Sequence, residues 1–189
     1  MKLLAYLMRH GETALSPTPE KWLQIGLTDA GRASVQSGAD YLKNAIEEGH
    51  RAPDYLVSSD LARTRETAAI TARTLGTAPA TPIWELRAYN EDDETLNQYA
   101  NRCQLALEPL LSGTRVPLIV AHRSTVSYLE KTAGPLPLRL GGKSLEEWEP
   151  DGGNERLRNG GVMAIMDSGL VVMHRPGSGH AAEPPIAVV

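Results

Sequence analysis

Several features that define other classes of protein are missing from this chain of 189 residues. It has one cysteine, Cys103, so no disulfide can form within the chain and a reducing compartment is expected. No segment approaches the ~20 apolar residues of a transmembrane helix, and the apolar run at residues 3–8 is too short for a secretory signal. These absences predict a cytoplasmic protein that makes no membrane contact.

The aromatic content is also low, because phenylalanine is absent and aromatic residues make up only 5% of the chain. Hydrophobic residues nevertheless reach 41%, enough for the core of one globular domain of this length. The core is therefore expected to consist of Leu, Ile, Val, Ala and Met. The net charge of -4 argues against a general nucleic-acid binder, which needs a basic surface.

Common catalytic signatures are missing as well. The chain has neither the Gly-x-x-x-x-Gly-Lys-Ser/Thr loop of nucleotide-binding proteins nor the Gly-x-Ser-x-Gly elbow of serine hydrolases. Its five histidines do not have metal-ligand spacing, so no metal site is expected. Three of them are predicted to be ordinary surface residues: His50, His174 and His180.

Short apolar segments alternate with segments of helical periodicity along the chain. Strands are predicted at residues 3–8, 55–57, 82–84 and 116–121, and as a closing hairpin at 162–166 and 170–173. Helices are predicted from Thr28, as the N-cap, to about Gly49, and from an N-cap at Ser59 or Asp60 onward. Two more are predicted over 96–111 and over 124–133. This alternation predicts an α/β fold with a mostly parallel sheet covered by helices on both faces.

One domain is predicted over residues 1–175. Residues 134–161 are rich in Gly, Pro and mixed charge, which indicates a surface excursion or lid. Residues 176–189 are rich in Pro and Gly and are predicted to form a flexible tail.

The polar residues that end the predicted strands suggest a site. The first strand runs into Arg9-His10-Gly11-Glu12, the strand at 116–121 runs into His122, and Arg63 lies one turn into the helix after a third strand. Carboxyl ends of parallel strands open on the same edge of a sheet, where ligands bind. Arg9, His10, Arg63 and His122 are therefore expected in one pocket. Four basic groups on an acidic protein suggest a small anion, and arginine's planar fork suits phosphate.

A histidine in such a pocket can do chemistry. Its neutral ring nitrogen can attack phosphorus while arginines hold the oxygens, and an acid must protonate the leaving oxygen. Glycine at position 11 is expected to allow close approach of a ligand or a positive φ. Glu85 is the preferred acid because it follows the short strand at 83–84. The other candidates lie nearby in the chain: Glu12, Glu91, Asp92, Asp93 and Glu94.

The chain resembles the histidine phosphatase superfamily, the phosphoglycerate mutase-like proteins. Residues 9–13, Arg-His-Gly-Glu-Thr, match its Arg-His-Gly (RHG) signature, and residues 27–31 resemble its Leu-Thr-x-x-Gly helix start. Residues 58–68 resemble its Ser-x-Leu-x-Arg-x-x-x-Thr-Ala segment, and residues 118–122 resemble the strand that delivers a second histidine.

The resemblance implies a three-layer α/β/α sandwich and a metal-independent phosphatase without cofactors. It implies that His10 is the nucleophile, that Glu85 is the proton donor, and that Arg9, Arg63 and His122 bind the phosphoryl group. The expected partner is a small phosphorylated substrate, and a homodimer is left open.

This sequence departs from the family pattern after the second histidine, where Arg123-Ser124 replaces the usual glycine. Ser16 stands where many members have asparagine, and no aromatic-Gly pattern follows Glu85. The segment between Glu85 and His122 is short, which favours hydrolysis over phosphoryl return. The alternatives are a phosphoglycerate-type mutase, a phosphatase of a phosphorelay protein, and a phospho-ligand-binding module without catalysis.

Overall fold

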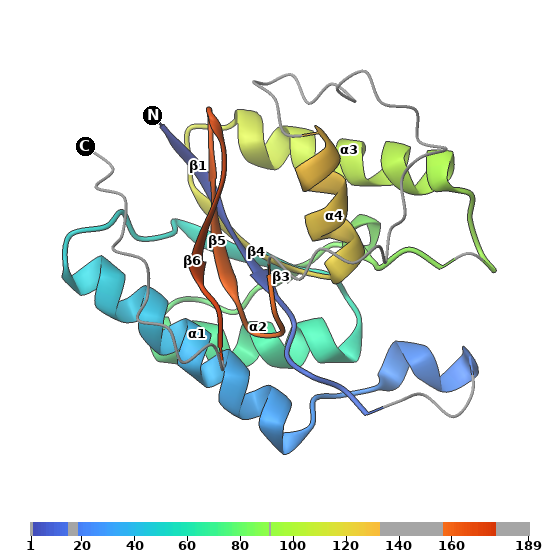
Figure 1. Cartoon of the computed structure of the whole chain (residues 1–189), viewed down its shortest axis with the longest axis horizontal. Coiled ribbons are helices and arrows are strands. Elements are labelled where there is room, and N and C mark those ends of the chain that lie inside the picture. Colours follow the sequence, from blue (N-terminus) through green and yellow to red (C-terminus); the bar gives the residue numbers. More distant parts are fainter. Residues whose placement is uncertain (1, 15–18, 91, 133–156, 177–189) are drawn as a thin grey trace.

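The chain is built around a six-stranded sheet with the strand order β3-β2-β4-β1-β5-β6 (Figure 1). The computed structural model describes residues 2–14, 19–90, 92–132 and 157–176. Its strands are β1 (Leu3–Arg9), β2 (Tyr55–Ser58), β3 (Thr81–Pro82), β4 (Pro117–Ala121), β5 (Val162–Met166) and β6 (Gly169–His174). The first four run parallel, and the β5–β6 hairpin joins β1 antiparallel. The predicted mostly parallel sheet is confirmed.

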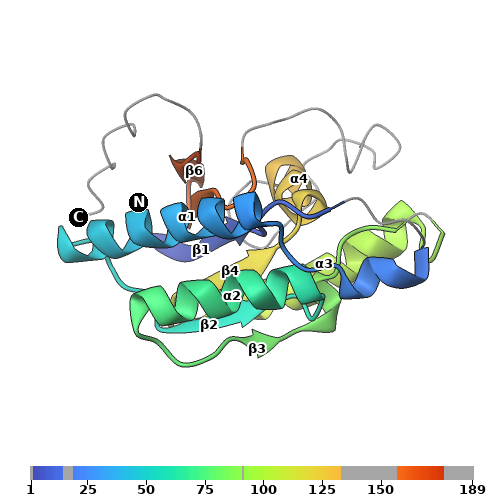
Figure 2. The ribbon, with the colours of Figure 1, turned by 90° about the horizontal axis from the view of Figure 1, so that it is seen from below.

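Helices cover both faces of this sheet. One face carries α1 (Asp29–Glu47) and α2 (Ala62–Leu75), and the other carries α3 (Leu96–Ser112) and α4 (Arg123–Thr132) (Figures 1 and 2). Two 3-10 helices, η1 (Pro19–Gln24) and η2 (Trp84–Leu86), lie in the connections. The arrangement is a three-layer α/β/α sandwich, as predicted.

The alternation of side chains along β1 divides the core in two. Ala5 and Leu7 pack in the cluster beneath α3 and α4, whereas Tyr6 and Met8 pack in the cluster beneath α1 and α2. Successive residues of a strand face opposite sides of a sheet, so a strand buried on both faces is apolar throughout. This accounts for the continuous apolar run that opens the sequence.

Tyrosine supplies part of the core, contrary to the expectation from composition. Tyr6, Tyr99 and Tyr128 are among the largest fully buried side chains. A buried tyrosine needs a partner for its hydroxyl. The Tyr6 hydroxyl donates to the carbonyl of Arg51 at 2.7 Å, and the Tyr99 hydroxyl lies 3.4 Å from Thr125 Oγ1. The aromatic bulk that phenylalanine would provide comes from tyrosines whose polar ends have local acceptors.

Two local predictions near the second and third strands are wrong. Neither Ser59 nor Asp60 caps α2, because the helix begins at Ala62 and its N-cap, Leu61, makes no side-chain bond. Asp60 instead pairs with Arg87. The strand expected at 82–84 is shorter and begins one residue earlier, as β3 (Thr81–Pro82), and the 3-10 helix η2 begins at Trp84. The predicted cap of α1 is confirmed, since the Thr28 side chain accepts from Gly31 N–H.

Parts of the predicted organisation fall on undescribed residues. Most of the expected lid, residues 133–156, lies outside the described residues, and so does the expected tail from 177 to 189. The single domain over 1–175 remains a prediction. In the described ranges, no helix is long and apolar enough to cross a membrane.

Candidate active site

The topology of the sheet determines where the predicted residues meet. β1, β4 and β2 are neighbours and parallel, so Arg9, Ala121 and Ser58 end their strands at the same edge. The chain leaves β1 for β2 and later returns through β4, which inserts between them. Such a reversal of strand order leaves a crevice at the carboxyl ends of the strands.

The two histidines after β1 and β4 lie side by side in this place. The backbone N–H of His10 donates to the carbonyl of Ala121 at 3.1 Å, which extends the pairing of the two strands by one residue. The rings of His10 and His122 then meet edge to face, with centroids 5.1 Å apart. His122 is only 1% exposed, and neither of its ring nitrogens has a hydrogen-bond partner among the described residues. Buried polar atoms are normally paired, so this ring points to a ligand.

His10 is held in the tautomer that suits a nucleophile. Its Nδ1 lies 2.7 Å from the carbonyl oxygen of Gly11. A carbonyl only accepts, so Nδ1 carries the proton and Nε2 keeps a lone pair. Loss of hydration is the main reason why the pKa of His10 is lowered to about 3. The hydrogen bond to Gly11 raises this pKa, whereas the charges of Arg63 and Arg9 lower it. The ring is therefore neutral at pH 7.

His122 is also neutral at pH 7, because its burial and the neighbouring His10 and Arg63 lower its pKa well below the ordinary value. The sequence suggested four basic groups of like kind in the pocket. The structure instead contains two permanent cations, Arg9 and Arg63, around two neutral imidazoles. A neutral imidazole offers one donor and one acceptor, whereas a dianion bound beside it favours the imidazolium form with two donors.

Two glycines of the predicted motifs contact each other. A Cβ on Gly11 would lie 2.4 Å from the carbonyl oxygen of Gly31, and a Cβ on Gly31 would lie 2.2 Å from that of Glu12. The N–H of Thr28 also donates to Glu12 O at 2.9 Å. Gly11 does not have a positive φ. The expected positive φ at Gly11 is therefore wrong, and close approach to a ligand stays a prediction; in the structure Gly11 allows α1 to pack against the end of β1.

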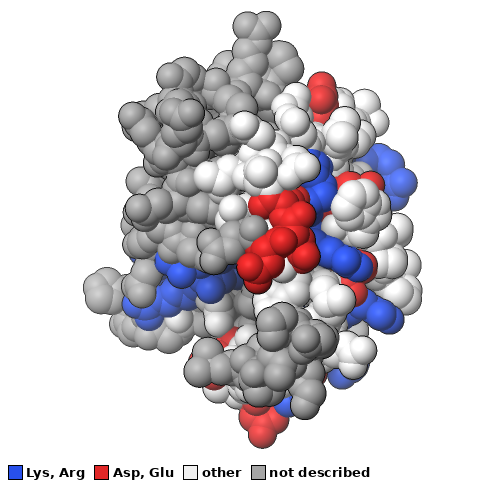
Figure 3. Space-filling model, turned by 90° about the vertical axis from the view of Figure 1, so that its right-hand side faces the viewer, with Lys and Arg blue, Asp and Glu red and all other residues white. Residues whose placement is uncertain are grey.

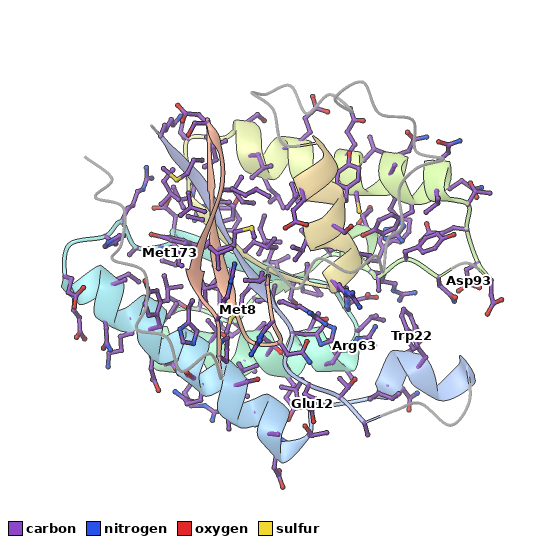
Figure 4. All side chains as sticks on the ribbon, viewed as in Figure 1. Met8, Glu12, Trp22, Arg63, Asp93 and Met173 are labelled. Atoms are coloured by element: carbon purple, nitrogen blue, oxygen red, sulfur yellow. The ribbon has the colours of Figure 1, made fainter. Side chains whose placement is uncertain are left out.

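Arg63 is buried at the start of α2. Its side chain points toward Trp22 of η1, where Nη1 donates to the Trp22 carbonyl at 3.0 Å and the guanidinium lies 4.4 Å from the indole centroid (Figure 4). Among the described residues, this is its only hydrogen-bond acceptor, so other N–H groups remain for a ligand. Burial lowers the pKa of Arg63 to about 10, which leaves it charged at pH 7. Trp22 thus holds Arg63 through both its carbonyl and its ring, whereas the neighbouring Leu23 is 43% exposed.

Arg9 is fixed by the turn that precedes β5. Its Nη1 donates to the carbonyl of Leu157 at 3.0 Å, and its own carbonyl accepts from Gly160 N–H at 3.0 Å. The charges of Arg9 and Arg63 both act on the two imidazoles. Arg9 also borders a cavity of about 540 Å³ between β1, α1 and this turn. The remaining lining residues are Glu12, Ala30, Ala33, Ser34, Ser37, Arg158, Asn159 and Pro176.

Residues 83–89, termed the η2 segment, cross the same edge of the sheet. Ile83 N–H donates to the carbonyl of Ser58 at 2.7 Å, Arg87 makes two hydrogen bonds to Asp60, and Tyr89 N–H donates to Ser124 Oγ at 3.1 Å. Ser58 ends β2, and Ser124 follows His122 by two residues. The η2 segment therefore brings Glu85 to the predicted edge. Among the described residues, the Glu85 carboxylate makes no hydrogen bond.

The other candidate acids have different surroundings. Glu94 is paired with Arg102, Asp93 accepts from Asn90, and Glu12 accepts from the Thr28 hydroxyl at 3.1 Å. Asp92 is exposed, and Glu91 lies outside the described residues. Acidic side chains gather on the side of the molecule that carries Asp93, with basic side chains beside them (Figures 3 and 4).

Several contacts at this edge were not found from the sequence. Thr67 Oγ1 accepts from Gly11 N–H at 3.2 Å, and the Trp22 and Leu157 carbonyls hold the two arginines. Backbone acceptors leave no mark in a sequence. The sequence pattern indicated a role for Arg102 only weakly, as a charged residue between Tyr99 and Cys103, which lie on the apolar face of an amphipathic helix. His174 was wrongly expected to be a surface residue: it is half-buried, stacks on Tyr41 and bonds Ser37.

The comparisons with known proteins agree with this fold. The family model of the histidine phosphatase superfamily (branch 1) matches residues 5–90. A mycobacterial glucosyl-3-phosphoglycerate phosphatase solved with VO3 superposes with a TM-score of 0.61 at 18% identity, covering 86% of this chain and 92% of its own. The protein histidine phosphatase SixA, solved with tungstate, gives 0.58 at 17% identity, covering 89% and 92%.

A phosphoglycerate mutase from Bacillus anthracis gives a TM-score of 0.61 at 15% identity, covering 89% of this chain and 90% of its own. The search of curated protein sequences found no match. The fold described above is also that of these solved proteins. The family model over residues 5–90 and the solved structures support the histidine phosphatase superfamily for this chain. That superfamily consists of phosphatases and mutases, so the match indicates a class of chemistry and leaves the substrate open.

The lowered pKa of His10 predicts a pH-dependent stability. Unfolded His10 takes up a proton near its ordinary pKa of about 6.5, whereas folded His10 does so only near pH 3. The unfolded chain then binds more protons, so the free energy of unfolding falls as pH drops below about 6.5. His10 alone is expected to contribute on the order of 2 kcal/mol between pH 6.5 and 5. Urea unfolding at pH 6.5 and at pH 5 measures this loss in the free energy of unfolding.

Two variants make that measurement specific to His10. His10→Ala should reduce the pH dependence, whereas His50→Ala should leave it unchanged, since His50 lies in the turn before the amino end of β2. An equal pH dependence in wild type and His10→Ala would contradict the lowered pKa.

Arg63→Lys is expected to lower kcat/KM by about 10²-fold or more, the usual effect of removing one oxyanion donor. Lysine keeps the charge, but it cannot hold the Trp22 carbonyl and two phosphate oxygens in one plane. The matched control is Arg65→Lys, an exposed arginine two residues further along α2. Near-wild-type activity of Arg63→Lys would mean that Arg63 does not bind the phosphoryl group.

Proposed function

We propose that the protein is a metal-independent phosphatase that hydrolyses small phosphomonoesters through a phosphohistidine on His10. One observation carries this proposal: a histidine with its Nε2 lone pair available lies against a buried histidine whose two ring nitrogens are unpartnered. Arg9 and Arg63 supply the positive charge around this pair. A phosphoryl group satisfies all of these requirements, because its oxygens accept hydrogen bonds and its phosphorus accepts the lone pair.

In the first half-reaction, His10 Nε2 forms a bond to phosphorus while the bond between phosphorus and the ester oxygen breaks. Glu85 gives its proton to that oxygen, and the alcohol leaves. In the second half-reaction, water attacks the phosphohistidine, its proton passes to the Glu85 carboxylate, and the N–P bond breaks to release inorganic phosphate. The proton count of the enzyme is then restored.

The phosphoryl oxygens would be held by Arg9, Arg63 and His122. The start of α4 adds a further contribution, because the helix begins directly after His122 and Val126 N–H already donates to the His122 carbonyl at 3.1 Å. The free N–H groups and the dipole at a helix N-terminus favour an anion. These groups are fixed by the fold before the substrate arrives, which is how electrostatic stabilisation of a transition state becomes effective.

We favour hydrolysis over a mutase reaction. Phosphoryl return to the same alcohol requires that the substrate is enclosed and water is kept out. The described residues between Glu85 and His122 comprise the rest of η2, the turn before α3, α3 itself and β4, without a further helix or strand to enclose the site. A non-catalytic phospho-ligand module is one of the outcomes of the test.

The test uses 4-nitrophenyl phosphate in the presence of EDTA, followed by rapid acid and base quenching. Full activity is expected in chelator, since permanent arginine charges stabilise the phosphoryl group. An acid-labile, base-stable phosphoenzyme is expected on His10. Phosphate binding without turnover would support the binding module. Phosphoryl transfer to a sugar or glycerate alcohol in place of water would support the mutase, and a requirement for added divalent ion would overturn the proposal.

A further inference from the structure

Arg102 of α3 binds the backbone of the η2 segment, which carries Glu85. Arg102 Nη1 donates to the backbone carbonyl of Glu85 at 2.6 Å and to that of Arg87 at 3.0 Å. Its Nε donates to Glu94 Oε2 at 3.0 Å, and its Nη2 pairs with the other Glu94 oxygen. One guanidinium therefore joins α3, the acidic turn before it and the two residues that flank Leu86.

Arg102 is itself fixed in place. Its side chain is 11% exposed and that of Glu94 is 15% exposed, so the pair is largely shielded from water. The guanidinium lies 5.0 Å from the Tyr99 ring centroid and 6.0 Å from that of Trp84. The N–H groups of this guanidinium bond the η2 segment on one side and Glu94 on the other. A buried arginine held in this way cannot change rotamer without losing several hydrogen bonds. Arg102 therefore fixes the backbone of Glu85 relative to α3.

The charge of the same residue reaches His122. The charge of Arg102, together with those of Arg63 and Arg9, contributes to the low pKa of His122. Arg102 has two possible influences on the site: its charge, which acts on His122, and its hydrogen bonds, which hold the Glu85 backbone. Since its donors go to carbonyl and carboxylate oxygens of the protein, its direct contacts are with the η2 segment and Glu94.

We propose that Arg102 is a positioning residue for the general acid, acting through the Glu85 backbone. This inference rests on the proposed function, in which Glu85 protonates the leaving oxygen. A general acid must lie within hydrogen-bond reach of the ester oxygen, so a shift of about 1 Å in the backbone that carries it is costly. The other hydrogen bonds of the η2 segment go to Ser58 at the end of β2, to Asp60 just beyond it and to Ser124 in α4, whereas Arg102 holds the backbone of Glu85 itself from α3.

The test compares Arg102→Lys and Arg102→Met on an alkyl phosphate and on 4-nitrophenyl phosphate. Lysine keeps the charge near His122, but it lacks the fork that binds two carbonyls and Glu94 together. Both variants are expected to lower kcat for the alkyl substrate by about 10-fold or more, part of the usual contribution of general acid catalysis. Neither should change the phosphorylation step with the aryl substrate by more than about 3-fold, because nitrophenolate leaves without a proton. KM should stay within about 3-fold for both substrates, since the phosphoryl-binding groups are untouched.

Arg115→Met is the matched control. Arg115 also stacks on a tyrosine, 4.5 Å from the Tyr55 ring, and donates to a backbone carbonyl, that of Asp54, but it lies at the opposite end of β2. Its loss should affect neither substrate. Equal losses in the rate of the phosphorylation step on both substrates in the Arg102 variants would overturn the inference in favour of a general structural role. Wild-type behaviour of Arg102→Lys would overturn it in favour of a charge effect.

Glu85→Gln separates this inference from the proposed function. If Glu85→Gln spares the alkyl reaction, the assignment of the acid fails whatever Arg102 does. If Glu85→Gln is slow and Arg102→Lys is not, only the positioning role fails. The double variant Glu85→Gln/Arg102→Lys should be no slower on the alkyl substrate than Glu85→Gln alone, because Arg102 then has no acid to position.

Discussion

His10→Ala is expected to abolish turnover of every phosphomonoester, because the phosphoryl group then has no nitrogen to which it can transfer. His122 is not expected to replace it, because in the proposed mechanism its ring bonds a phosphoryl oxygen and lies edge to face against His10 rather than in its place. The loss should be at least 10³-fold in kcat, in the range found when an enzyme loses its nucleophile. Steady-state release of phosphate measures the loss, and quenched samples should contain no phosphoenzyme.

The control variant is again His50→Ala, which removes a histidine of the α1–β2 turn and should keep full activity. Binding of orthovanadate or phosphate to His10→Ala, followed calorimetrically, should remain detectable, because Arg9, Arg63 and His122 are still present. More than a few per cent of wild-type activity in His10→Ala would refute the covalent mechanism. Loss of anion binding together with activity would indicate that the substitution had disrupted the site as a whole.

Glu85→Gln is expected to slow alkyl phosphate hydrolysis by about 10²–10⁴-fold, the usual range for general acid catalysis. An alkoxide is a poor leaving group and must be protonated as the bond breaks. Glutamine has the same shape as glutamate and cannot supply that proton. The backbone carbonyl at position 85 still accepts from Arg102, so the η2 segment should keep its position.

The aryl substrate gives a different expectation for the same variant. Nitrophenolate leaves unaided, so phosphorylation of His10 should change little, whereas hydrolysis of the phosphohistidine should slow, because the carboxylate no longer accepts the proton of water. Glu85→Gln should therefore show a burst of nitrophenolate equal to the enzyme concentration. Equal losses on both substrates without a burst would mean that another carboxylate is the acid. Glu91 and Glu12 would then be tested with the same pair of substrates.

The sequence by itself determined the layers of the fold and which strand ends meet at the candidate site. A buried parallel strand must be apolar on both faces, so the runs at residues 3–8 and 116–121 could be recognised, and so could the polar residues that end them. Parallel strands then bring Arg9, His10 and His122 to one edge without further information. Caps such as Thr28 are equally local, because the side chain bonds an N–H only three residues away.

Only the tertiary structure decided how those residues are charged and held. The neutral state of His10 depends on burial and on arginines from other elements, so no local pattern encodes it. Asp60 looks like a helix cap in the sequence, but Arg87 competes for its carboxylate across the η2 segment. The anchors of the two site arginines, at Trp22 and Leu157, and of Glu85, at Arg102, join distant parts of the chain. All three contacts use a backbone carbonyl as the acceptor of an arginine N–H. Every residue carries a carbonyl, so its identity gives no sign of the role, and only the packing of the three layers selects which one is used.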